Sequence, residues 1–116
     1  MAVDKLGLRK ITNEVSDRIR DVLGSKLCKI LLFGSYARGD NHDESDIDIM
    51  VLADVDDKDE FQRMEKTVWN IGWKIGSQHD IMVCVFLHDN SHFYEWLAAL
   101  AFYRNVAQDG VVLYES

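Results

Sequence analysis

The chain has 116 residues and a formal net charge of −7 at pH 7, with 20 acidic and 13 basic side chains. This length predicts a single domain over residues 1–116, and the 47% hydrophobic content is enough for a packed core. The acidic balance argues against broad, sequence-independent nucleic-acid binding, which needs Lys and Arg to neutralise phosphates. No apolar run approaches the roughly 20 residues that span a bilayer, and the N-terminal residues lack a signal peptide's apolar stretch. We therefore expect a cytoplasmic protein without membrane contact.

The order of predicted elements indicates an α/β (α+β) fold in which helices pack on a small mixed sheet. Apolar residues at helical spacing predict long helices at residues 4–23, about 59–76 and 91–108. Apolar runs rich in β-branched residues predict strands at residues 27–33, 46–53, 80–87 and 111–114, the last at a sheet edge. Between the first two strands we expect a turn, a short helix beginning at residues 36–38 and a polar loop at residues 39–45.

Two aspartates stand at the start of the second predicted strand. Asp46 and Asp48 are two residues apart, so their side chains point to the same face of that strand. Asp is disfavoured in strands, and like charges on one face repel. A chain accepts this arrangement most readily when a cation lies between the carboxylates, whose oxygens are the ligands that Mg²⁺ selects. A simpler interpretation is an edge strand with solvated acids that discourage aggregation.

The turn before this strand is suited to phosphate. Gly34 has no side chain to keep an anion from the backbone, and Ser35 adds a hydroxyl donor. A helix that begins here would also present free N–H groups to an anion. Arg38 could contact a phosphate as well, or it could pair with an acid such as Asp46 to order the loop.

A third carboxylate is needed if two metal ions are to be held about 3.5–4 Å apart. Asp80 is the best candidate, because it opens the predicted third strand and could lie beside the second. The other acids, at residues 54–60, fall in a loop or a first helical turn, where solvated acids are ordinary. The predicted metal ligands are therefore Asp46, Asp48 and Asp80.

These residues together resemble a known pattern. Gly34-Ser35, ten intervening residues, Asp46-Ile47-Asp48 and a later strand aspartate are similar to the active site of the DNA polymerase β nucleotidyltransferase superfamily. The run from Gly34 is close to the form seen in minimal nucleotidyltransferases. The final segment, residues 109–114, resembles that group too, so the resemblance covers about residues 5–114.

The resemblance implies an enzyme that transfers a nucleoside monophosphate to a hydroxyl. The nucleotide that it implies first is AMP, taken from ATP. The carried-over catalytic and metal-binding residues are Asp46, Asp48 and Asp80, with two Mg²⁺ ions expected. The carried-over nucleotide-binding residues are Gly34, Ser35 and Arg38. Minimal members of the family often pair with a helical HEPN-type ribonuclease, and some act as antitoxins that transfer AMP to a tyrosine of that partner. The resemblance therefore implies a HEPN-type partner.

A second function remains open. The chain could keep the fold as a non-catalytic module that binds nucleotide or only masks a partner. Trp69 and Trp73 flank the main apolar stripe of their helix, so a partner surface or a homo-oligomer is a further expectation. Cys28 and Cys84 fall in predicted strands, where reduced thiols serve as small apolar residues.

Overall fold

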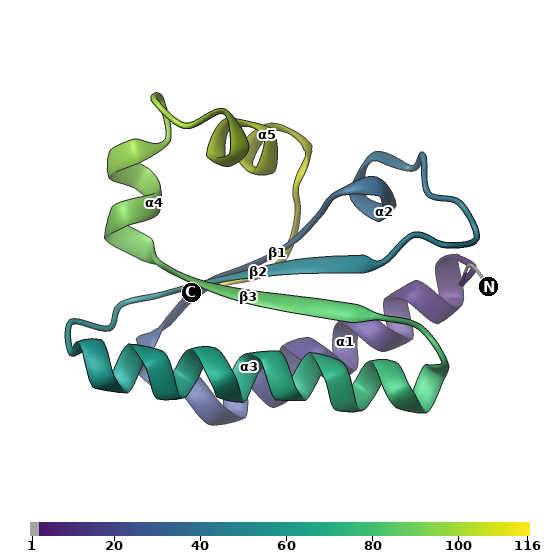
Figure 1. Cartoon of the computed structure of the whole chain (residues 1–116), viewed down its shortest axis with the longest axis horizontal. Helices are drawn as coiled ribbons and strands as arrows, with labels where there is room; N and C mark the ends of the chain where they lie inside the picture. The colour runs from purple at the N-terminus through teal and green to yellow at the C-terminus, as the bar shows by residue number, and fades with distance from the viewer. Residues whose placement is uncertain (1–2) are drawn as a thin grey trace.

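A four-stranded mixed sheet forms the centre of the computed structural model, which describes residues 3–116 (Figure 1). The strands are β1 (Leu27–Phe33), β2 (Ile47–Ala53), β3 (Val83–Asp89) and β4 (Val111–Glu115). They lie in the order β3-β2-β1-β4, so β3 and β4 are the edges. β1 pairs antiparallel with β2 and β4, whereas β2 pairs parallel with β3. The predicted fold class is confirmed.

Helices cover both faces of the sheet. They are α1 (Lys5–Leu23), a short 3₁₀ turn (Gly24–Lys26), α2 (Ser35–Arg38), α3 (Lys58–His79), α4 (Asn90–Trp96) and α5 (Ala101–Asp109). α1 and α3 lie on one face, and α4 and α5 lie on the other (Figure 1). The parallel pairing of β2 and β3 requires a crossover connection, and α3 supplies it.

Aspartate side chains cap the N-termini of three of these helices. Asp4 accepts a hydrogen bond from the Gly7 amide at 2.8 Å, at the N-terminus of α1. Asp57 and Asp89 accept comparable bonds at the starts of α3 and α4, each 2.9 Å long. Such caps satisfy amides that have no partner within the helix, and each is worth about 1 kcal/mol. These caps therefore fix where the helices begin.

The alternation of side chains along the strands builds two cores. On the face toward α1 and α3, residues such as Ile30 and Ile49 pack with apolar residues of both helices. On the opposite face, Phe33 and Met50 pack with Phe93 of α4 and with residues of α5. Burial on both faces explains why β1 and β2 read as nearly continuous apolar runs.

The C-terminal helix predicted at residues 91–108 is two helices, with a turn at residues 97–100. The rings of Phe93 and Tyr103 pack with centroids 4.8 Å apart. In a straight helix these positions would stand about 15 Å apart along the axis. The contact between the two rings therefore requires the break, and Arg104 donates to the Ala98 carbonyl at 2.7 Å across the turn.

Within residues 3–116, no helix combines the length and the apolar character that crossing a bilayer would demand.

Candidate active site

The turn at Gly34 lies against the carboxylate of Asp48. Gly34 has φ 77° and ψ −158°, a backbone region that is essentially open only to glycine. A Cβ atom built at this position would lie 2.5 Å from Oδ2 of Asp48. The fold therefore brings together the predicted phosphate-binding turn and one of the predicted metal ligands.

Asp48 is held by the central ladder of the sheet. It pairs with Phe33 on β1 and with Cys84 on β3, and it is half-buried. Asp46 stands one residue before β2 and is exposed. Burial, and then the charge of Asp46, raise the pKa of Asp48 from 3.8 to about 6, while the Arg38 guanidinium opposes this rise.

Cys84 pairs with Asp48 in the ladder, but it does not offer a thiolate. Burial, followed by the charges of Asp48 and Asp46, raises the pKa of its thiol to about 11. The thiol therefore stays protonated at neutral pH, and only oxygen donors face a ligand here. Oxygen donors suit Mg²⁺ and disfavour zinc or copper.

The residues present fit a magnesium site of limited protein ligation. The raised pKa of Asp48 shows that its charge is poorly compensated, and a cation would relieve that cost. Among residues 3–116, no group of three His, Cys, Asp or Glu side chains is placed to hold a metal. Mg²⁺ commonly binds through one or two carboxylates and completes its shell with water and substrate phosphates. Asp46 and Asp48 match that pattern.

The predicted position of Asp80 is wrong. β3 begins at Val83, and α3 continues to His79, so Asp80 is the C-cap of a helix and not the first residue of a strand. It has φ 57° and is exposed. α3 packs on the face opposite Asp48, because Ile47 and Ile49 point toward α3 and Asp48 alternates with them. The structure does not bring Asp80 to the pair.

The neighbouring His79 explains why α3 extends past the predicted end near residue 76. Its Nε2 lies 3.2 Å from Oε1 of Glu14 on α1, which ties the last turn of α3 to that helix. The amide of Asp80 then bonds to the Gly76 carbonyl in a left-handed cap. Asp tolerates this conformation better than most residues, so the acid serves the end of the helix.

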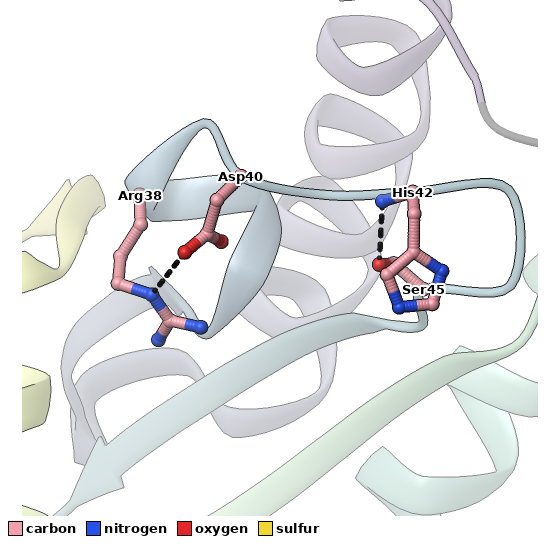
Figure 2. A network of polar contacts seen from close by, with 4 residues as sticks. All are labelled: Arg38, Asp40, His42 and Ser45. Carbon is pink, nitrogen blue, oxygen red and sulfur yellow. Dashed lines mark hydrogen bonds and ion pairs between the residues drawn. The ribbon is translucent and has the colours of Figure 1, made fainter.

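Arg38 pairs with an acid of its own loop. Its Nε donates to Oδ2 of Asp40 at 3.2 Å, and Figure 2 shows the two side chains facing each other. Further along the loop, the His42 amide donates to Oγ of Ser45 at 2.9 Å (Figure 2). The exposed Arg38–Asp40 pair is worth at most about 1 kcal/mol, so the guanidinium can exchange partners at low cost.

A small cavity that the sequence did not indicate borders the Gly34 turn. It has a volume of about 200 Å³, and its walls include Phe33, Gly34, Arg38, Phe102 and Asn105. Helical spacing admits either Tyr103 or Phe102 on the apolar face of this segment, and the structure buries Tyr103 at 5% exposure and leaves Phe102 49% exposed. No sequence signal could have indicated this cavity, because its walls come from the end of β1 and from α5, which packing brings together.

Comparison with known proteins identifies the family. Residues 8–109 match the nucleotidyltransferase domain. A provisionally named protein adenylyltransferase of Methanocaldococcus jannaschii is 31% identical over 105 residues, covering 90% of this chain and 96% of that protein. The crystal structure of a toxin–antitoxin with AMP-PNP aligns at 28% identity with a TM-score of 0.55, covering 90% of this chain and 73% of that chain.

A third similarity concerns the fold alone. A chain from the complex of a tri-AMPylated Shewanella oneidensis HEPN toxin with an MNT antitoxin aligns with a TM-score of 0.52 at 24% identity. The alignment covers 93% of this chain and 72% of that chain. The match over residues 8–109, the similarity to the Methanocaldococcus protein and the placement of Gly34 beside Asp48 agree. This chain belongs to the nucleotidyltransferase domain family and is a minimal nucleotidyltransferase.

Proposed function

We propose that this protein uses Mg²⁺ to transfer AMP from ATP to a hydroxyl group of another protein. The observation that carries the proposal is the contact between the Gly34 turn and the Asp48 carboxylate. It joins a backbone that can approach phosphate oxygens to a hard oxygen ligand. A nucleoside triphosphate with its metal needs both within one short span.

Asp46 and Asp48 are the proposed metal ligands, and Gly34 and Ser35 are the proposed triphosphate ligands. Bound Mg²⁺, as one or two ions, would neutralise phosphate charge and lower the pKa of the attacking hydroxyl. That hydroxyl gives up its proton to solvent as it attacks the α-phosphorus, an O–P bond forms, and the bond to pyrophosphate breaks. The protein contributes mainly positioning and electrostatic stabilisation. Asp80 is left out of the metal set, since it caps α3 on the other face.

The proposed acceptor is a tyrosine of a HEPN-type protein, and the chain would act as its antitoxin. Support comes from relatives: one similar structure is a toxin–antitoxin with AMP-PNP, and another contains a tri-AMPylated HEPN toxin. The similar Methanocaldococcus protein carries the name of a protein adenylyltransferase. Asp46 is exposed, so a protruding side chain of a partner can approach the carboxylate pair.

One observation favours the non-catalytic alternative. Asp46 and Asp48 have no third carboxylate grouped with them among residues 3–116, so a complete two-metal site is not formed by these side chains alone. A chain that binds Mg²⁺–ATP through two carboxylates and a turn could mask a partner without transferring AMP.

The test is a transfer assay with mass spectrometry. The purified protein is incubated with a candidate HEPN partner, Mg²⁺ and each labelled NTP, next to the Asp48→Asn variant as control. Addition of AMP to a partner tyrosine by the wild type but not by Asp48→Asn supports the proposal. Binding of Mg²⁺–ATP and of the partner without any transfer favours the masking module. Modification of a small alcohol in place of the partner overturns the protein acceptor.

A further inference from the structure

The cavity beside the Gly34 turn is placed to bind the base of a nucleotide. It is about 200 Å³ in volume and lies between the end of β1, α2 and α5. Its principal lining residues are Phe33, Gly34, Arg38, Phe102, Asn105 and Asp109. We propose that this cavity is a nucleobase subsite that favours bases with an exocyclic amino group. The proposal rests on the proposed function, since it assumes that the triphosphate binds at Gly34 and Ser35.

The position of the cavity follows from the turn at Gly34. The Asp48 carboxylate lies against Gly34, where metal and phosphate would bind. Gly34 and Arg38 also form part of the cavity wall. A nucleotide is a continuous ligand, so its base must lie within one ribose of its phosphates. The cavity is the hollow that shares the turn with the phosphate site.

Aromatic side chains give the cavity an apolar wall. Phe33 and Phe102 pack edge to face with ring centroids 5.7 Å apart. Phe33 is only 9% exposed and is held from behind by Phe86, whose ring centroid lies 6.1 Å away. Phe102 is 49% exposed, so its ring remains available. Stacking of a base on an exposed aromatic ring is a common source of nucleotide affinity.

Polar side chains give the same cavity a recognition edge. Asn105 and Asp109 are four residues apart on α5, so they lie on one face of that helix. The Asn amide both donates and accepts hydrogen bonds, whereas a carboxylate only accepts. Adenine, cytosine and guanine offer an exocyclic amino donor. Uracil presents carbonyl oxygens at the equivalent positions, which a carboxylate repels.

The experiment compares three ligands by calorimetry in the presence of Mg²⁺: ATP, UTP and inorganic tripolyphosphate. Wild-type protein should bind ATP about tenfold more tightly than tripolyphosphate, with UTP weaker than ATP. Phe102→Leu and Asn105→Leu should each remove most of the advantage of ATP and leave the tripolyphosphate affinity unchanged. Phe102→Tyr, which keeps the ring, should retain it. Trp73→Leu is the control, because it removes a 62% exposed aromatic side chain from α3, on the other face of the sheet.

The outcomes separate the two proposals. Equal affinities for ATP and tripolyphosphate, or an unchanged ratio in Phe102→Leu, would overturn the nucleobase subsite while leaving the phosphate turn intact. ATP and UTP of equal affinity would overturn the recognition by Asn105 and Asp109. Failure of wild-type protein to bind tripolyphosphate would instead overturn the proposed phosphate site. Binding of ATP that still depends on Phe102 would in that case support the subsite by itself.

Discussion

The carboxylate of Asp48 occupies the space that a side chain at Gly34 would need. A Cβ atom at Gly34 would stand 2.5 Å from Asp48 Oδ2 and 3.4 Å from its Cγ. The glycine is therefore required twice, once by its backbone angles and once by its neighbour. This double requirement links the phosphate-binding turn to the carboxylate, so a change at either position should affect the other.

Gly34→Ala should destabilise the protein and weaken Mg²⁺–ATP binding more than Gly39→Ala does. Gly39 also has a positive φ, of 82°, but a Cβ there meets nothing within 4 Å. Gly39→Ala should therefore cost only about 1–2 kcal/mol of backbone strain. Urea denaturation and calorimetry measure both effects. If the contact with Asp48 matters, Asp48→Ala should recover part of the stability lost in Gly34→Ala, and full additivity of the two changes would contradict this.

Asp48→Asn should stabilise the metal-free protein at neutral pH and abolish its response to Mg²⁺. The folded state raises the pKa of Asp48 from 3.8 to about 6, so it holds this proton more tightly than the unfolded chain. The contribution of Asp48 to the stability of the wild type therefore falls as pH rises from about 4 to 6, and it stays low at higher pH. The variant should show a higher Tm than wild type at pH 7.5 and no difference below pH 4.

Millimolar Mg²⁺ should then raise the wild-type Tm by mass action and leave that of Asp48→Asn unchanged. A wild-type Tm that ignores saturating Mg²⁺ and Mn²⁺ would count against the carboxylate pair as a metal site.

Asp80→Asn should leave the Mg²⁺ response and the transfer rate close to those of wild type. Asp80 is an exposed helix cap with φ 57°, a conformation that Asn adopts readily. Asp80→Gly should be neutral or slightly stabilising for the same reason. Thermal shift with Mg²⁺, followed by the transfer assay, decides the matter. A strong loss of transfer in Asp80→Asn with intact nucleotide binding would restore this residue as the third catalytic acid.

His88 should make stability rise with pH near neutrality. Burial, and then the charge of His92, lower the pKa of His88 below 6.5, although Glu65 opposes this. Its Nδ1 lies 2.9 Å from the Tyr103 hydroxyl. In the neutral ring Nδ1 can accept a hydrogen bond that this hydroxyl donates. The contribution of His88 is thus present above pH 6.5 and is lost as pH falls through the lowered pKa.

His88→Phe keeps a ring of similar size and removes the titration. The difference in unfolding free energy between wild type and this variant should shrink or reverse on going from pH 7.5 to pH 5. Because Asp48 is common to both proteins, its opposite pH dependence cancels in the comparison. A difference that stays constant over this range would show that His88 has the same proton affinity in the folded and unfolded states.

The central strands and the turn could be predicted because local sequence decides them. The apolar run at residues 27–33 is typical of a buried strand. Gly34 follows the end of this strand, and Asp48 pairs with its last residue in the ladder. The end of α3 could not be predicted, since the tie between His79 and Glu14 joins residues 65 positions apart. The break near residue 98 likewise depends on a tertiary contact between Phe93 and Tyr103.

The cavity beside the turn was missed for the same reason. A continuous helix over residues 91–108 would not have turned Phe102 and Asn105 toward Gly34. Arg38 illustrates the reverse case: of the two roles that the sequence left open, phosphate contact or pairing with an acid such as Asp46, the structure shows an acid pair, with Asp40 only two residues away. Local partners were within reach of the sequence, and partners brought together by packing were not.

The pairing of Phe33 with Asp48 determines where this protein can tolerate insertions and deletions and where it cannot. The polar loop between them, residues 39–45, lies outside the ladder and ahead of the proposed ligand Asp46, so insertions or deletions there change its closure entropy only slowly. A single residue inserted within β2 would instead turn Asp48 toward the apolar layer beneath α3 and expose Ile49 in its place. Changes in the length of the loop therefore leave the sheet and the site in place. A change of register in β2 would displace the Asp48 carboxylate and disrupt the core at the same time.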